Sequence, residues 1–505
     1  MMSMLLRQSQ PSKRGLGFSI ARGFSSCVPV DAPLRRVCVV GSGPAGFYAT
    51  KFLLKEYAGA RVDMLELLPT PFGLVRFGVA PDHPEVKSVI NDFSKVAADD
   101  RFRFLGNVRV GEDVTLAELR QHYNAVLLAY GAPGDREVGI RGENLRGVLA
   151  ARTFVNWYNG HPDFCDLELD LKQVESAVII GQGNVAVDCA RILTKDVDEL
   201  AMTDIAAHAI DALRSSSLKK VSIVGRRGSV QAAFTIKEIR ELIKVNDVSC
   251  IVNPDDLERS MTPASEQEIK DERARKRMND LLGKAAKEKH MEGAKRVVNI
   301  KFLSSPTEII ADRNDPTRVG AIRVEKMKLE GEPKRQRAVG TGIFEDIPCN
   351  LVLRSIGYKS LPIDTDVPFD NNRSVILNNK GRVVTTSNNG MKKRVVGLYC
   401  TGWVKRGPSG IIGTNIFDAR ETVGCIIEDF AAGKFLHSQL MSGNDLGGLE
   451  AVEKLIKERN PDKQLIGWSD YERISAEEER RGEVVGKPRE KVTSVSEMLD
   501  IARSG

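Results

Sequence analysis

The sequence lacks closely spaced metal-binding and redox-active side chains. Its 8 cysteines form no C-x-x-C pair, and its 6 histidines are scattered without paired ligand spacing. These absences argue against a thioredoxin-like dithiol, a zinc ribbon, an intrinsic iron–sulfur cluster and a resident metal ion. Any redox chemistry must therefore come from a bound organic cofactor.

A long apolar run is also missing. No stretch approaches the roughly 18 consecutive apolar residues of a membrane span, so none is expected. Hydrophobic residues make up 42% of the 505 residues and charged residues 28%, which is typical of a soluble globular enzyme. The length predicts two domains rather than one.

Acidic residues are absent from residues 1–30, which contain Arg7, Lys13, Arg14 and Arg22. This serine-rich, basic segment has no continuous apolar core and predicts an organelle presequence, mitochondrial in preference to plastid, with the matrix as destination. A merely disordered tail is the alternative. Subtracting these four charges from the net +6 leaves +2, so no general binding to nucleic acid is expected.

A glycine-rich motif follows the first predicted strand, residues 35–40. Gly41 permits a tight turn, Gly43 lets the backbone approach a pyrophosphate, and Gly46 lets the following helix pack closely. The next predicted strand ends in Glu66, 20 residues after Gly46, where a carboxylate can accept hydrogen bonds from ribose hydroxyls. A carboxylate disfavours a 2′-phosphate, so this motif predicts an FAD or NAD site.

The same pattern recurs at residues 177–186, where Ala186 takes the place of the third glycine. Here the following strand ends in Arg226 and Arg227 instead of an acid. Two guanidinium groups suit a 2′-phosphate, so the second site is predicted to bind NADP(H); a solvated basic turn is the alternative. One acidic and one diarginine site together indicate electron transfer between a pyridine nucleotide and a flavin.

A third glycine-rich element lies near the carboxyl end. A strand predicted at residues 397–402 is followed by the glycine-rich residues 407–415 and a helix from about residue 416. An element of this kind fits the returning half of the first nucleotide-binding domain.

An ordered set of motifs resembles the adrenodoxin reductase family. They are residues 41–46, 72–76, 80–85, 181–188, 225–228, 234–238, 403–412 and 486–491. The resemblance implies a mitochondrial-type NADPH:ferredoxin reductase, which passes a hydride from NADPH to FAD and then single electrons to a [2Fe-2S] ferredoxin. It also implies an α/β fold with two Rossmann-like domains, an NADP domain (135–359) being inserted into a discontinuous FAD domain (31–134 and 360–505).

The resemblance assigns cofactor contacts as well. The implied FAD contacts are Ala45, Glu66, Leu74, Val110 and Trp403, with Gly410, Ile411 and Ile412 around the flavin end. The implied NADP contacts are Gln182, Gly183, Asn184 and Val185 at the pyrophosphate, Arg226, Arg227 and Glu238 at the 2′-phosphate, and Gly410 at the nicotinamide.

Hydride transfer needs two rings held close together in a dry site rather than an acid–base pair. His83 and Asp188 each lie just beyond a cofactor motif. We hypothesise that they meet near the flavin as catalytic residues, relaying a proton or orienting the nicotinamide. A histidine that satisfies a turn and an unrelated helix carboxylate are the alternative.

The small ferredoxins of this family are usually acidic, so the partner implies a basic docking patch. Candidate residues are Arg240, Arg273, Arg275, Lys276 and Arg277. The surrounding segment mixes both charge signs, and a solvated helix is the alternative.

Three other functions stay open. A disulfide reductase would need a dithiol near the flavin, and a relative of the small chain of glutamate synthase would carry cluster-binding cysteines at its amino end. A catalytically silent nucleotide sensor is opposed by the intact glycines and by both arginines. Bound FAD that NADPH fails to reduce would favour the sensor.

Overall fold

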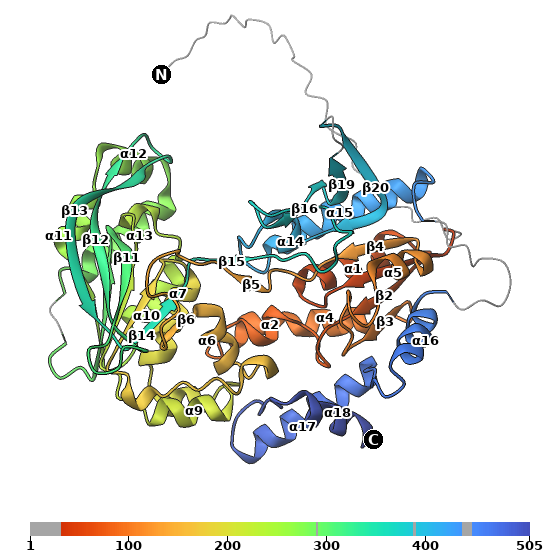
Figure 1. The fold of residues 1–505 in the computed structure, drawn as a ribbon, viewed down its shortest axis with the longest axis horizontal. Coiled ribbons are helices and arrows are strands. Elements are labelled where there is room, and N and C mark those ends of the chain that lie inside the picture. The colour runs from red at the N-terminus through yellow and green to blue at the C-terminus, as the bar shows by residue number, and fades with distance from the viewer. Residues whose placement is uncertain (1–31, 289–290, 387–389, 437–446, 505) are drawn as a thin grey trace, which may run out of the picture.

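The chain folds into two α/β lobes joined at a narrow waist (Figure 1). The computed structural model describes residues 32–288, 291–386, 390–436 and 447–504. The presequence predicted at residues 1–30 lies outside the described residues. Within these ranges, no helix is long and apolar enough to cross a membrane.

A seven-stranded sheet forms the first lobe, in the order β18-β19-β20-β4-β1-β2-β3. Its strands are β1 (Arg35–Val40), β2 (Ala60–Leu65), β3 (Phe102–Leu105), β4 (Ala125–Leu128), β18 (Asn378–Asn379), β19 (Arg382–Thr386) and β20 (Lys392–Cys400). β1 pairs in parallel with β2 and β4, and β20 pairs in parallel with β4. Strands from both ends of the chain therefore share one sheet.

Helices cover both faces of this sheet. They are α1 (Pro44–Glu56), α2 (Leu74–Phe77), α3 (Pro84–Lys87), α4 (Val89–Ala97), α5 (Leu116–His122), α14 (Trp403–Arg406), α15 (Thr414–Ala431), α16 (Leu449–Arg459), α17 (Trp468–Val484) and α18 (Val495–Arg503). The aromatic core on one face is centred on Phe47, whose ring stacks on Phe93 with a centroid distance of 4.9 Å. α15 begins two residues before the predicted start and lies beside α1, so the returning carboxyl-terminal segment completes this lobe.

The second lobe contains a six-stranded, entirely parallel sheet in the order β6-β14-β7-β8-β10-β9. Its strands are β6 (Val148–Ala150), β7 (Ser176–Ile180), β8 (Lys220–Val224), β9 (Val248–Val252), β10 (Arg296–Lys301) and β14 (Leu351–Arg354). Its helices are α6 (Ala151–Tyr158), α7 (Asn184–Thr194), α8 (Val197–Ala201), α9 (Ala207–Arg214), α10 (Ile236–Ile243), α11 (Pro254–Ser260), α12 (Pro263–Asp271) and α13 (Arg273–Ala285), with short 3₁₀ turns η1 (Pro162–Phe164), η2 (Leu171–Gln173) and η3 (Ser229–Gln231).

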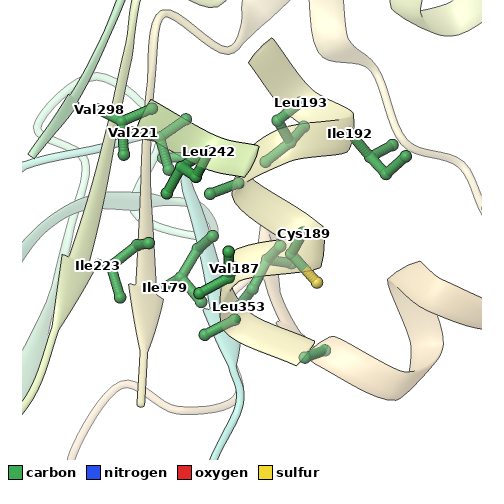
Figure 2. Close-up of a cluster of buried hydrophobic side chains, with 14 of the residues drawn as sticks. Ile179, Val187, Cys189, Ile192, Leu193, Val221, Ile223, Leu242, Val298 and Leu353 are labelled. Carbon is green, nitrogen blue, oxygen red and sulfur yellow. The ribbon is translucent and has the colours of Figure 1, made fainter. Parts of the chain in front are cut away.

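Figure 2 shows why α7 packs on this sheet. Its apolar side chains, Val187 among them, face Ile179 of β7 and Ile223 of β8, and all three are fully buried. Strands buried on both faces carry continuous apolar runs, as the sequence of β7 does.

The other face of the sheet is covered by an antiparallel sheet that the sequence analysis missed. Its strands are β11 (Ser304–Ala311), β12 (Val319–Glu330) and β13 (Arg337–Pro348). Ile322 and Val324 of β12 pack against Val178 and Val224 of the parallel sheet. β13 is exposed over most of its length and carries little apolar periodicity, which explains why sequence patterns did not reveal it.

The chain crosses between the lobes at two places that pair with each other. β5 (Gly134–Asp135) leads into the second lobe, β15 (Tyr358–Lys359) leads back, and the two are antiparallel. The predicted fold class, two Rossmann-like domains with the second inserted into the first, is confirmed. The exact boundaries at residues 134/135 and 359/360 stay a prediction.

A carboxyl-terminal segment forms a second link between the lobes. Lys491 and Lys87 both bind the Asp204 carboxylate of the second lobe, at 2.9 and 2.6 Å. Lys487 Nζ donates to the carbonyl of Ile205 at 2.7 Å. The chain end thus ties the first lobe to the loop between α8 and α9.

Burial lowers the pKa of Lys491 to about 7, despite the attraction of Asp204. An unfolded lysine titrates near 10.4, so between pH 7 and 10 the unfolded state binds more protons and Lys491 makes stability rise with pH, by at most ~1.4 kcal/mol per unit. We predict that Lys491→Met, which leaves Asp204 paired with Lys87, removes this contribution. Urea unfolding at pH 7 and pH 9 checks it.

The exposed Lys434→Met is the matched control and should keep the wild-type pH dependence. If Lys491→Met and the wild type gained the same stability between the two pH values, Lys491 would not be the titrating group.

Candidate functional site

The first cavity opens at the carboxyl end of β1 and has a volume of about 360 Å³. Among the residues that line it are Gly41, Gly43, Ala45, Glu66, Leu74, Val110 and Trp403. The fold thus brings together most of the residues that the family resemblance assigned to FAD. They come from the turn after β1 and the start of α1, from the end of β2, from α2, from the segment between β3 and α5, and from α14.

The three glycines of the first motif have different surroundings. Gly41 has φ +104°, which L side chains rarely adopt, and a Cβ on Gly46 would lie 2.2 Å from the carbonyl oxygen of Gly41. These two glycines are required by the turn and by helix packing, and Gly46 does not line the cavity. At Gly43 a Cβ would meet no heavy atom within 4 Å. Gly43 therefore leaves an open cradle at the amino end of α1, which suits a pyrophosphate.

Glu66 is fixed at the ribose end of this cradle. Its Oε2 accepts from the backbone N–H of Ser42 at 2.9 Å and from the Ser42 hydroxyl at 2.5 Å. Its Oε1 accepts only a long bond from the Leu68 N–H at 3.3 Å, which leaves acceptor capacity for ribose hydroxyls. A fixed carboxylate here repels a 2′-phosphate, so the residues fit FAD.

The second cavity opens at the carboxyl ends of β7 and β8 and has a volume of about 790 Å³. Among its lining residues are Gln182, Gly183, Asn184, Val185, Arg226, Arg227, Gly410 and Ile411. Gly183 repeats the open cradle of Gly43, since a Cβ there would meet nothing within 4 Å. With two exposed arginines at the ribose end, the residues fit a dinucleotide that carries a 2′-phosphate.

The two cavities meet at Tyr358 and Trp403, which line both. Their ring centroids are 5.5 Å apart. Tyr358 belongs to the inter-lobe strand β15, and Trp403 begins α14. The turn before Trp403 is held by the Asp418 carboxylate, which accepts from the Gly402 N–H and from the Thr401 hydroxyl. Two bound dinucleotides would therefore approach each other at this aromatic pair.

His83 and Asp188 do lie near each other, but Arg191 links them. The nearest nitrogen of His83 is 4.0 Å from the Asp188 carboxylate, while Arg191 Nη2 lies 2.6 Å from that nitrogen and 2.7 Å from that carboxylate. Asp82 also binds Arg191, at 2.7 Å. Neither His83 nor Asp188 is among the residues that line the two cavities. The geometry is that of a buried ion cluster, and a catalytic role for the pair stays a prediction.

A hydrogen bond and burial shift the pKa values of His83 and Asp188. A hydrogen bond to Glu238 raises the pKa of His83, and burial raises the pKa of Asp188 to about 6. Glu238 is bound here, 3.1 Å from Arg191, and does not line the second cavity. Its assignment to the 2′-phosphate therefore has no support from the geometry.

Ile412, assigned to the flavin end, packs against the core of the first lobe and lines neither cavity.

Several lining residues escaped the sequence analysis. They are Arg152, Asn156 and His161 in the first cavity, Arg136 and Arg354 in the second, and Tyr358 in both. Burial lowers the pKa of His161 to about 4, and its Nδ1 accepts from the Asp163 N–H at 3.2 Å, so its proton resides on Nε2. No local motif surrounds these residues. They come from α6 and the turn after it, from the segments around β5 and β15, and from the end of β14, which only the tertiary fold brings to the cavities.

Comparisons with known proteins agree with this geometry. The family model described as pyridine nucleotide-disulphide oxidoreductase matches residues 35–253. The chain is 46% identical to the mitochondrial NADPH:adrenodoxin oxidoreductase of Arabidopsis thaliana, covering 96% of this chain and 98% of that protein, and 46% identical to that of Homo sapiens, covering 92% and 91%. It is 40% identical to the NADPH-ferredoxin reductase FprA of Mycobacterium leprae, covering 93% and 98%.

A solved structure of Mycobacterium tuberculosis FprA in complex with NADPH is similar to this chain over its whole fold. The TM-score is 0.83 at 40% sequence identity, with 93% of this chain and 99% of that chain covered.

The contrast between Gly43 and Gly46 gives a test of the first cradle. We predict that Gly43→Ala leaves the stability of the apoprotein unchanged but weakens FAD binding at least tenfold, because the new methyl group stands where the pyrophosphate lies. Gly46→Ala should instead destabilise the apoprotein by about 1–3 kcal/mol through overpacking. Thermal unfolding and FAD titration of the apoproteins separate the two effects. Wild-type FAD affinity in Gly43→Ala would refute the assignment of the cradle.

Proposed function

The chain belongs to the NADPH:adrenodoxin oxidoreductase family, and we propose that it transfers electrons from NADPH through FAD to a ferredoxin of the adrenodoxin type. It is an FAD-dependent oxidoreductase. The observation that carries the proposal is the meeting of two dinucleotide cavities with opposite ribose ends, Glu66 in one and the Arg226–Arg227 pair in the other, at Tyr358 and Trp403.

FAD supplies the conversion that this reaction needs, because a flavin accepts two electrons together and releases them singly. The role of the protein is to position the two nucleotides, because hydride transfer needs no acid–base catalysis. Gly43 and Gly183 would leave room for the two pyrophosphates, and Tyr358 and Trp403, which line both cavities, would lie beside the reacting rings. Holding the rings close in a site with few waters lowers the barrier to hydride transfer.

We propose the residue assignments on the same basis. Gly41, Gly43, Ala45, Glu66, Leu74, Val110 and Trp403 would hold FAD, and Gln182, Gly183, Asn184, Val185, Arg226, Arg227, Gly410 and Ile411 would hold NADP. The family resemblance assigned Ile411 to the flavin end; we assign it to NADP because it lines the second cavity. The FAD domain would comprise residues 31–134 and 360–505 and the NADP domain residues 135–359, a division supported by the β5–β15 crossing.

The protein partner is proposed to be an acidic [2Fe-2S] ferredoxin. Four of the candidate docking residues, Arg240, Arg273, Lys276 and Arg277, are exposed on α10 and α13 of the second lobe. Relatives are named mitochondrial, and we place this chain in the same organelle, with the matrix as the proposed compartment.

A disulfide reductase of similar fold is disfavoured by the cysteines. Within the described residues all of them are free, and none lines either cavity. No dithiol therefore stands where a flavin could reduce it.

Nucleotide selectivity tests the assignment of the two sites. We predict that NADPH reduces the flavin of the purified holoprotein readily under anaerobic conditions and that NADH does so poorly. Replacing both Arg226 and Arg227 with alanine should raise the KM for NADPH about 100-fold and leave that for NADH nearly unchanged, because each charge-assisted bond from an exposed arginine contributes about 1.5 kcal/mol, roughly a factor of ten. Anaerobic titration and steady-state kinetics measure this. A flavin indifferent to both nucleotides would favour the sensor.

Salt dependence tests the docking surface. We predict that the KM for an acidic ferredoxin rises with ionic strength and that Arg277→Gln weakens this dependence, because exposed charges act through a screened field. Arg313→Gln, an exposed arginine in the turn between β11 and β12, is the matched control and should behave like the wild type. Ferredoxin reduction that does not respond to salt would contradict electrostatic docking.

A further inference from the structure

Arg275 differs from the other basic residues at the start of α13. Arg273, Lys276 and Arg277 are exposed, whereas the side chain of Arg275 is only 31% exposed. Its Nη1 donates to the carbonyl of Val230. The side chain points back into the second lobe, away from the surface on which a protein partner would dock.

Three contacts of Arg275 fix its position. Besides the bond to Val230, its Nε donates to Glu272 at 2.9 Å, and its Nη1 lies 3.5 Å from Glu268. Glu268 is itself buried and accepts from the Lys334 N–H at 2.7 Å. A guanidinium anchored to a carbonyl and to two carboxylates loses little further freedom when a ligand binds nearby.

Val230 lies in the 3₁₀ turn that follows the arginine pair. The 3₁₀ turn η3 follows Arg226, Arg227 and Gly228 directly, and its last residue, Gln231, lines the second cavity. A second bond from the same helix supports this turn, since the hydroxyl of Ser229 donates to the Asn279 side chain at 3.1 Å. α13 thus holds the loop that presents the two arginines to the cavity.

The positive charge of Arg275 also acts on the side chain of Arg227. Partial burial lowers the pKa of Arg227, and the positive charges of Arg226 and Arg275 lower it further, against a smaller opposing effect of Glu268. Arg275 is itself paired with Glu268 and Glu272 and does not line the cavity. Its charge adds to the repulsion between the two guanidinium groups that do line the cavity, those of Arg226 and Arg227. A phosphate dianion bound between Arg226 and Arg227 relieves that repulsion, which makes the site more selective for a 2′-phosphate than the pair alone would be.

We propose that Arg275 is a specificity-determining residue of the 2′-phosphate subsite, which positions the Arg226–Arg227 loop and adds a third positive charge to it. This inference rests on the proposed function, in which the second cavity binds NADPH. It removes Arg275 from the candidate ferredoxin-docking residues, since its donors point to Val230, Glu268 and Glu272.

The test measures nucleotide binding without turnover. Purified holoprotein is titrated with 2′,5′-ADP, which carries the 2′-phosphate, and with 5′-ADP, which lacks it. Arg275→Gln removes the charge but keeps a donor for the Val230 carbonyl, and Arg275→Lys keeps the charge. We expect Arg275→Gln to weaken 2′,5′-ADP binding about fivefold and 5′-ADP binding little, the range of a partly exposed charge interaction. Arg275→Lys should recover most of the loss.

Ferredoxin kinetics separate this role from docking. Arg275→Gln should leave the salt dependence of the KM for ferredoxin at its wild-type value, and Arg277→Gln should change it while keeping wild-type affinity for 2′,5′-ADP. Equal weakening of both nucleotides by Arg275→Gln, unchanged affinity for both, or an altered salt dependence for ferredoxin would overturn the proposal.

The wild type serves as the separate check on the proposed function. If wild-type protein bound 2′,5′-ADP no more tightly than 5′-ADP, the NADP assignment of the second cavity would fail whatever the variants did. The visible spectrum of the bound flavin and the thermal midpoint of each variant establish that it is folded.

Discussion

The pairing of β5 with β15 is the constraint on which the site depends. Tyr358 pairs with Asp135 there, and Arg136 donates to the carbonyl of Gly357 through its backbone N–H at 3.2 Å. Because the chain enters and leaves the second lobe through this one ladder, the carboxyl ends of the parallel strands in the two sheets face each other. Tyr358 consequently lines both cavities, and Trp403 meets it from the first lobe. Without this junction each lobe would hold only an isolated nucleotide.

The difference between the two cavities is electrostatic rather than topological. Both have an open glycine cradle at a helix amino end, Gly43 in one and Gly183 in the other. At the ribose end one cavity presents a fixed carboxylate and the other the guanidinium groups of Arg226 and Arg227. Similar backbones therefore select different nucleotides, because a 2′-phosphate is repelled at Glu66 and attracted at Arg226 and Arg227.

Outside the cavities, buried charged side chains are neutralised by ion pairs. Arg191 is buried among Asp82, Asp188, His83 and Glu238, so it satisfies carboxylates that would otherwise be costly to bury. The sequence suggested only the hypothesis that His83 and Asp188 meet near the flavin. In the structure they lie 4.0 Å apart with the Arg191 guanidinium between them, which no feature of the sequence indicated. Arg191 stands at a helical position with no motif of its own, and its partners come from three segments.

The sequence by itself determined the two strand–glycine–helix units, the order of Glu66 before the Arg226–Arg227 pair, and the insertion of one nucleotide-binding unit into the other. The first two features follow from short patterns, a glycine turn at a helix amino end and a charge at the end of the next strand. The insertion followed from the order of the motifs along the chain and from the family resemblance. Only the tertiary structure decided that Tyr358 and His161 line a cavity. It also decided that Glu238 binds Arg191 and that Arg275 binds the turn after the Arg226–Arg227 pair. Those outcomes depend on packing between separate segments, which lie 47 residues apart for Arg191 and Glu238 and 45 residues apart for Arg275 and Val230, and no short pattern records such packing.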